Sequence, residues 1–197
     1  MRRDVINIYV SGVGGQGIGM LTETLGQACL AAGYAIHGCD THGLAQRGGT
    51  VISHLRLGDG VFTPRVPEGE AHVVIALERL EALRAVHTHL REGGTLLYYD
   101  AVYQPIAVRM GEAPYPAASA LDAAVAARDG RAHRVFVEGL EDPRMQNSAL
   151  LGALAALALV PGVDVQRAEA AVRASVPGAA VDANLAVLRK AASVHGA

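Results

Sequence analysis

The chain of 197 residues contains no tryptophan, two phenylalanines and a single lysine, and aromatic residues make up only 4% of it. Its formal net charge is -2, so it lacks the basic surface that binds a polyanion. It also has too few aromatic rings to stack on bases. These absences argue against nucleic acid as a binding partner.

Cysteine is scarce as well, because Cys29 and Cys39 are the only two in the chain. They form neither a C-x-x-C motif nor a ferredoxin-like run, so this chain alone should bind neither an iron–sulfur cluster nor a structural zinc ion. We expect both to be small buried side chains in a reducing, cytoplasmic compartment. The histidines also show no metal-ligand spacing, and we assign no metal to them: His37, His54, His72, His87, His89, His133 and His195.

No long hydrophobic run is present. The residues after Met1 do not resemble a signal peptide, because the apolar stretch behind them is short and runs into a glycine-rich turn. The longest apolar stretch, residues 149–160, is well short of the roughly 20 residues that a membrane span needs. We therefore expect no membrane association and interpret this stretch as a buried core helix.

The chain contains enough apolar residues, 51%, to form a single domain with a hydrophobic core over residues 1–197. Apolar runs alternate with helical periodicity through residues 1–139, which predicts an α/β, Rossmann-like fold with a mostly parallel sheet and helices on both faces. Residues 140–197 show helical patterns only and should form a C-terminal helical cluster packed on the sheet. Expected strands are 5–10, 34–39, 50–57, 71–77, 95–99 and 134–137, and expected helices are 18–32, 78–90, 119–129, 143–160 and 180–192.

Local signals refine these boundaries. Gly33 should end the first helix, and Asp142 and Asp164 should cap the helices that follow them. The turn at 58–60 could fold the preceding strand back on residues 61–63 as a hairpin. Residues 101–118 contain three prolines and predict an irregular connection.

The first glycine-rich segment, GVGGQG at 12–17, follows the first strand and opens the first helix. Gly12, Gly14 and Gly17 match G-x-G-x-x-G, in which the glycines allow a tight turn, a close approach to pyrophosphate and close helix–strand packing. Asp40, after the second strand, could bind a ribose hydroxyl. One interpretation is a dinucleotide site, and the other is a turn that docks a protein partner.

A second glycine-rich segment covers residues 41–49 and follows the second strand. His42, Gln46 and Arg47 lie among glycines, where their side chains could reach a ligand or another chain. The guanidinium of Arg47 is suited to a carboxylate or a phosphate. The alternative interpretation is a solvated surface loop.

With these two segments, the chain resembles the small (gamma-type, or beta) subunit of the 2-oxoacid:ferredoxin oxidoreductases, most nearly that of the indolepyruvate enzymes. The residues that carry the resemblance run through most of the chain in order. They are GVGGQG at 12–17, THGLAQRGGTVISHLRLG at 41–58, PEGEAHVVIALERLEALR at 67–84, NSALLGAL at 147–154 and, more weakly, NLAVL at 184–188.

The resemblance implies a Rossmann-like subunit that binds no cofactor alone and is inactive alone. A larger partner subunit is expected to carry thiamine diphosphate, Mg and iron–sulfur clusters, with coenzyme A as co-substrate and ferredoxin as electron acceptor. Arylpyruvates are the expected substrates, and other 2-oxo acids stay open. An isolated chain could pair as a homodimer.

The resemblance also assigns residues. The first loop consists of Gly12, Gly14, Gly15, Gln16 and Gly17, and the second includes His42, Gln46, Arg47, Gly48 and Gly49; both should face the partner subunit near the substrate and coenzyme A channel. Glu78 could join this site or only favour the start of its helix. Asn147 could hydrogen-bond to the glycine loop or to nearby backbone.

The thiamine motif itself is incomplete in this chain. The thiamine-binding motif is G-D-G followed further along by an asparagine that helps to hold magnesium. Gly58-Asp59-Gly60 matches its first part, but no asparagine follows at the required spacing. Two alternatives remain open from sequence: an independent NAD(P)- or FAD-binding oxidoreductase, and a binding module without catalytic activity.

Overall fold

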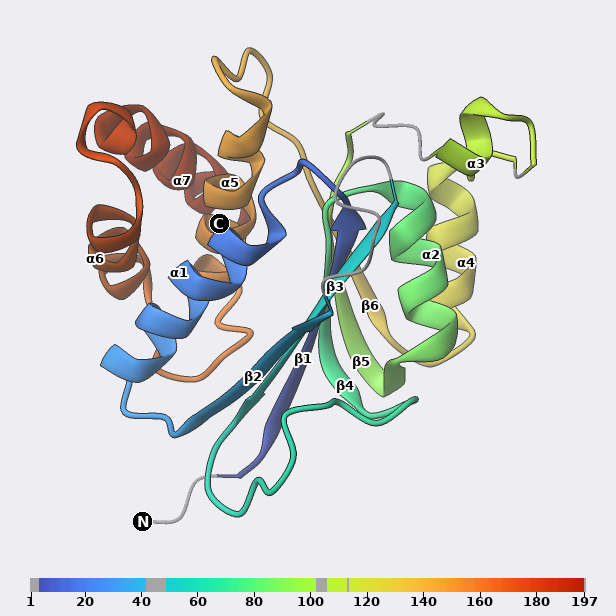
Figure 1. Cartoon of the computed structure of the whole chain (residues 1–197), viewed down its shortest axis with the longest axis horizontal. Helices are drawn as coiled ribbons and strands as arrows, with labels where there is room; N and C mark the ends of the chain where they lie inside the picture. The colour runs from blue at the N-terminus through green and yellow to red at the C-terminus, as the bar shows by residue number, and fades with distance from the viewer. Residues whose placement is uncertain (1–3, 42–48, 102–105, 113, 197) are drawn as a thin grey trace.

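The computed structural model describes residues 4–41, 49–101, 106–112 and 114–196. Six strands form one sheet in the order β2-β3-β1-β4-β5-β6 (Figure 1). The expected α/β fold with a mostly parallel sheet is confirmed. The strands are β1 (Ile6–Val13), β2 (Ile36–Thr41), β3 (Thr50–Leu57), β4 (Ala71–Ala76), β5 (Leu90–Tyr99) and β6 (Arg131–Val135).

Strand β3 is the exception to the parallel arrangement. It pairs antiparallel with β1 on one side and with β2 on the other. Both of its edges are therefore occupied, and the hairpin suggested for residues 61–63 is wrong because these residues form no strand. Strand β6 begins three residues and ends two residues earlier than expected, since its parallel pairing with Thr95–Tyr99 of β5 uses residues 131–135.

Helices cover both faces of the sheet (Figure 1). Helices α1 (Ile18–Ala31) and α5 (Gln146–Ala156) lie on one face, and α2 (Arg79–Thr88) and α4 (Ala118–Ala126) lie on the other. The expected C-terminal helical cluster is present: α6 (Val165–Ser175) packs on α1, and α7 (Val181–His195) packs on α5. A single turn, α3 (Ile106–Arg109), lies in the connection after β5.

The helix boundaries follow the local signals. Gly33 adopts a φ of 84° after α1, as expected for a glycine that ends a helix. Asp142 accepts a hydrogen bond from the Arg144 amide, but it caps a short 3-10 turn that precedes α5. Helix α5 ends four residues earlier than expected, because Ala158 adopts a φ of 50°. Asp164 caps α6 as expected.

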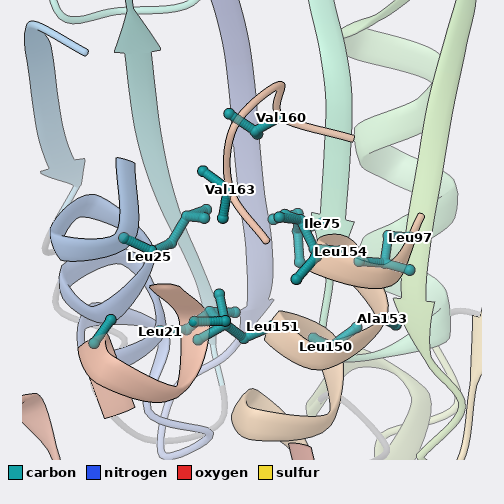
Figure 2. Close-up of a cluster of buried hydrophobic side chains, with 14 of the residues drawn as sticks. Leu21, Leu25, Ile75, Leu97, Leu150, Leu151, Ala153, Leu154, Val160 and Val163 are labelled. Carbon is teal, nitrogen blue, oxygen red and sulfur yellow. The ribbon is translucent and has the colours of Figure 1, made fainter. Parts of the chain in front are cut away.

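The larger core lies between the sheet and the α1–α5 layer. Figure 2 shows leucines of these two helices meeting side chains of β4 and β5. Each fully buried side chain of this kind contributes about 1.5–3 kcal/mol to stability. The residues of this core that are labelled in Figure 2 are Leu21, Leu25, Ile75, Leu97, Leu150, Leu151, Ala153, Leu154, Val160 and Val163.

Helices α5 and α7 approach each other closely at Gly152. A β-carbon at Gly152 would overlap the carbonyl oxygen of Leu188, so only glycine allows this contact. The contact fixes the position of α5, whose first turn reaches the glycine-rich loop. No helix within the described residues is long and apolar enough to cross a membrane.

Candidate functional site

The glycine-rich loop joins the end of β1 to the start of α1. Gly15 and Gly17 adopt φ values of 103° and 77°, in the left-handed region that favours glycine. At Gly12, a β-carbon would lie 2.9 Å from Gln16 Oε1 and 3.1 Å from the β-carbon of Leu77. The glycines therefore allow the strand, the helix and the end of β4 to pack closely.

The side chain of Gln16 is buried and closes the loop from inside. Its Oε1 accepts a hydrogen bond of 2.7 Å from the Val13 amide. Its Nε2 donates one of 2.7 Å to the carbonyl oxygen of Leu77. Gln16 therefore joins the loop to β4, and both of its polar atoms are used inside the protein.

Asn147 supports the same loop from the first turn of α5. Its Nδ2 donates to the carbonyl oxygens of Gln16, at 3.2 Å, and Gly17, at 3.0 Å. Of the two roles suggested by sequence, the structure shows the bond to the glycine loop. The other polar atom, Oδ1, is buried without a hydrogen bond to the described residues.

The two glycine-rich segments meet at one point. The Gly14 amide donates a hydrogen bond of 2.9 Å to the carbonyl oxygen of Gly49. Strand pairing continues the contact, since Val13 lies opposite Thr50. His42, Gln46, Arg47 and Gly48 lie outside the described residues.

Between the neighbouring strands β1 and β4, the connections that leave the sheet switch from one face to the other. A crevice is expected at this point. The chain leaves β1 for α1 on one face and leaves β4 for α2 on the other. Ligands of open α/β sheets bind outside the carboxyl ends of the strands at such a point. The glycine loop ends β1 there, and Glu78 follows β4.

Glu78 is fully buried at this position and caps α2. Its Oε2 accepts a hydrogen bond of 3.0 Å from the Glu81 amide, whereas its Oε1 is buried with no hydrogen bond to the described residues. Burial raises the pKa of Glu78 above its usual range, and the Glu81 amide opposes this shift. The structure shows the helix-capping role, and the buried acid also lies at the carboxyl edge of the sheet.

A second buried acid, Glu81, was missed from sequence. Its Oε1 accepts a hydrogen bond of 2.6 Å from Arg84, and its Oε2 is buried with no hydrogen bond to the described residues. Burial raises the pKa of Glu81 as well, and the charge of Arg84 opposes the shift. The signal available in the sequence was its spacing of three from Glu78, which places both acids on one side of α2.

The end of β5 carries a further acid that sequence reasoning missed. Asp100 is buried and forms ion pairs with Arg79, at 2.6 Å, and Arg134, at 2.5 Å. Arg79 also lies over the ring of Tyr115, with its guanidinium carbon 5.4 Å from the ring centroid. The signal was an acid directly after a buried strand. This network joins the carboxyl ends of the strands next to Glu78.

The site thus combines backbone amides at the start of α1 with the carboxyl groups of Glu78 and Glu81, whose pKa values are raised by burial. Amides at a helix start favour an anionic group. Within the described residues, no group of three or more His, Cys, Asp or Glu side chains could hold a metal ion.

The sheet, the glycine loop and the position of Glu78 define a Rossmann-like α/β protein in which an antiparallel strand separates β1 from β2. The family model described as "Pyruvate ferredoxin/flavodoxin oxidoreductase" matches residues 7–194, and the chain belongs to this family. The resemblance seen in the sequence is confirmed.

Known proteins of this family are similar along nearly the whole chain. The chain is 36% identical over 185 residues to "Indolepyruvate oxidoreductase subunit IorB" of Pyrococcus horikoshii, covering 91% of this chain and 90% of that protein. The gamma subunit of a keto/oxoacid ferredoxin oxidoreductase from Geobacter sulfurreducens has a TM-score of 0.64 at 21% identity, covering 96% of this chain and 98% of that one.

A second solved structure places the fold within a longer chain. The 2-oxoglutarate:ferredoxin oxidoreductase of Magnetococcus marinus matches with a TM-score of 0.69 at 16% identity. The match covers 98% of this chain and 31% of that one. At these identities the two solved structures establish the shared fold.

Proposed function

We propose that this chain is the small, non-thiamine subunit of a 2-oxoacid:ferredoxin oxidoreductase acting on indolepyruvate or another arylpyruvate. It works with a larger subunit that carries thiamine diphosphate, Mg and iron–sulfur clusters, and it is inactive alone. The name of the relative that is 36% identical over 91% of the chain supports this substrate class. The reaction is oxidative decarboxylation to an acyl-coenzyme A, for which the partner's thiamine supplies the carbanion chemistry.

The residues of this chain do not fit the cofactors that we assign to the partner. Gly58-Asp59-Gly60 follows the end of β3 at Leu57, which lies opposite Ile6 at the start of β1. That end of the sheet is opposite the glycine loops. Cys29 lies in the hydrophobic core with none of its surface exposed, as expected, whereas Cys39 on β2 is only half-buried, contrary to the expectation. The incomplete thiamine motif and Cys29 are therefore away from the site, and Cys39, three residues before His42, is a single thiol that cannot hold an iron–sulfur cluster by itself.

The sheet order disfavours the alternative of an independent dinucleotide enzyme. In the usual Rossmann fold, the strand that carries the ribose-binding acid is next to β1. Here β3 lies between β1 and β2, so Asp40 is two strand spacings, about 10 Å, from β1. Its carboxylate instead accepts a hydrogen bond of 2.5 Å from Ser53.

The single observation that carries the proposal for the site is the hydrogen bond between Gly14 and Gly49. It anchors the end of the second glycine-rich segment next to the first. We expect His42, Gln46 and Arg47, which precede this anchor, to contribute to the coenzyme A and substrate channel shared with the partner. The guanidinium of Arg47 would hold a carboxylate or a phosphate there.

The test uses the complex of this chain with the partner that copurifies from its native cells under anaerobic conditions. Ferredoxin reduction is measured with coenzyme A and either arylpyruvates, branched-chain 2-oxo acids or pyruvate, and arylpyruvates should give the highest kcat/KM. Arg47→Ala should lower kcat/KM by about tenfold or more, the loss expected for one charge-assisted hydrogen bond. The matched control, Arg91→Ala, removes an exposed arginine from β5 near its start, away from the carboxyl edge, and should have no effect.

Two results would count against the proposal. Recovery of the chain alone with bound NAD(P) or FAD would support the independent enzyme. Unchanged activity of the Arg47→Ala complex would remove the second segment from the site while leaving the subunit assignment intact.

A further inference from the structure

The segment 61–70 connects the turn after β3 to the start of β4 and contains neither helix nor strand. It lies at the end of the sheet opposite the glycine loops (Figure 1). Of its side chains, only Val61 and Val66 are buried. With so little apolar anchoring, the attachment of this segment depends on its hydrogen bonds. We call residues 61–70 the strap.

A buried histidine holds the middle of the strap. The Val66 amide donates a hydrogen bond of 3.1 Å to Nδ1 of His54 on β3, whose surface is 1% exposed. A backbone amide can only donate, so Nδ1 must be the unprotonated nitrogen of a neutral imidazole ring. A proton on this nitrogen would turn the acceptor into a donor and would remove the bond.

A second histidine supports the strap through Asn7. The Asn7 amide donates a hydrogen bond of 3.1 Å to Nδ1 of His72, and its side-chain nitrogen donates one of 3.0 Å to the carbonyl oxygen of Glu70. Asn7 Oδ1 also accepts from Arg56, whose guanidinium donates to the carbonyl oxygen of Thr63. For the same reason as in His54, Nδ1 of His72 must be unprotonated.

The surroundings of His54 disfavour a positive charge. The ring of Tyr9 on β1 lies edge-on at a centroid distance of 5.2 Å, and the ring of His89, at the end of α2, lies at 5.8 Å. Burial lowers the pKa of His54 below its usual 6.5, and the charges of His89 and Arg65 lower it further. Burial lowers the pKa of His89 as well, which Glu68 on the strap opposes.

His72 has a comparable environment. Burial lowers its pKa, the charge of Arg91 on β5 acts in the same direction, and Glu70 on the strap opposes the shift. Glu81 of α2 also faces the aromatic cluster, where its charge helps to raise the pKa of Tyr9. Both histidines that support the strap therefore bind a proton less readily in the folded protein than in water.

We infer that the strap opens in acid, and that proton uptake by His54 and His72 drives the opening. In the closed strap each Nδ1 accepts from an amide, whereas in the open strap each ring reaches water and can take a proton. The closed form is therefore fully favoured above the ordinary pKa of histidine, about 6.5, and loses stability as the pH falls toward the lowered values.

Each histidine should raise the equilibrium constant for opening by up to about tenfold per pH unit in that range. Opening exposes Val61 and Val66 at the end of the sheet opposite the glycine loops. The inference does not depend on the proposed function, since the two concern opposite ends of the sheet.

Hydrogen exchange of the Val66 amide in the full-length chain, between pH 5 and pH 8, tests the inference. After correction for the intrinsic exchange rate, protection should be constant above about pH 7 and fall by about tenfold or more per pH unit below about pH 6. His54→Asn supplies an amide oxygen, which accepts a hydrogen bond but does not take up a proton in this range. Protection in this variant should fall less steeply.

His72→Asn should also reduce the steepness, and the double variant should be flatter than either single variant. The matched control, His87→Asn, replaces an exposed histidine of α2 and should keep the wild-type slope. If a variant fails to fold, the ring signals of His54 in the wild type give the same test, because they should titrate together with the loss of Val66 protection.

Three results would overturn the inference. The first is protection of Val66 that does not change between pH 5 and pH 8. The second is a fall that is as steep in both asparagine variants as in the wild type. The third is an equal loss of protection at Ile75 in the middle of β4, because the whole sheet would then open and not the strap alone.

Discussion

The side-chain nitrogen of Asn147 lies 3.0 Å from the carbonyl oxygen of Gly17, although the two residues are 130 positions apart in the sequence. The same nitrogen bonds to the carbonyl oxygen of Gln16. Both carbonyl groups are thus held by the C-terminal helices. The shape of the glycine loop therefore depends on contacts with a distant part of the chain as well as on the residues of the loop itself.

Replacement of Asn147 should destabilise the loop in a graded way. Asn147→Ala removes two hydrogen bonds from buried carbonyl groups and should cost about 1–3 kcal/mol of unfolding free energy. Asn147→Asp should cost more, because a carboxylate cannot donate to those oxygens. Urea unfolding and amide hydrogen exchange of residues 13–18 measure both effects. The control, Asn184→Ala, replaces a buried asparagine bonded to Ser148 and should lower stability without faster exchange in the loop. If the loop amides exchange equally fast in the Asn147 variants and in the wild type, the prediction for Asn147 is contradicted.

Two glycines only two positions apart should respond to alanine with opposite signs. Gly17→Ala forces a side chain into a φ of 77° and puts its β-carbon 2.9 Å from Asn147 Nδ2, so it should lose about 1–3 kcal/mol. Gly19→Ala lies in α1 with nothing within 4 Å, and should gain about 0.5–1 kcal/mol. Thermal unfolding of both variants gives the signs, and a neutral Gly17→Ala would show that the loop tolerates a different backbone.

The buried acid Glu78 should make stability depend on pH in an uncommon direction. Its pKa in the folded protein is raised by burial above the ordinary 4.5, so folding favours its neutral form. That contribution is fully present below about pH 4.5 and is lost as the pH rises through the raised folded value. Glu78→Gln keeps a hydrogen-bond acceptor but cannot ionise. The unfolding free energy of the wild type, relative to this variant, should therefore fall with increasing pH.

Urea unfolding between pH 4 and pH 8 measures this difference. The raised pKa of Glu81 acts in the same direction, so the Glu78→Gln/Glu81→Gln double variant should be flatter still. Glu92→Gln, at an exposed position on β5, serves as the control and should parallel the wild type. A constant difference between the wild type and Glu78→Gln would show that Glu78 has no shifted pKa.

The ion pairs of Asp100 should matter more than those at the surface. Asp100→Asn leaves Arg79, which is 19% exposed, without its charged partner and should cost about 1–3 kcal/mol. Asp142→Asn removes an exposed pair with Arg144 and should cost at most about 1 kcal/mol. Chemical denaturation compares them, and equal losses would mean that solvent screens both networks alike.

Most of the fold could be predicted from sequence because its signals are local. Apolar runs bounded by Gly33 and by the glycine loop mark the strands and helices of the parallel part, and Asp164 marks the start of α6. Strand β3 shows the limit of this approach. Its alternating pattern indicates a strand, but its place between β1 and β2 depends on pairing across the sheet. The periodicity of the sequence does not predict which strands pair.

The candidate site divides in the same way. The glycine pattern predicts a tight turn, and the structure has one. The direction of the Gln16 side chain could not be predicted, because it depends on the carbonyl group of Leu77, 61 residues away. Glu81 and Asp100 were overlooked since an acid near a helix start or a strand end is ordinarily solvated, and only the packed structure shows that these two are buried.

The bond between Asn147 and the glycine loop has a consequence for the order of events during synthesis. A ribosome releases the strands β1–β6 and helices α1–α4 before α5 emerges. The two carbonyl groups that Asn147 binds must wait for that helix. A chain that terminates before α5 would therefore lack both hydrogen bonds from Asn147 to the loop.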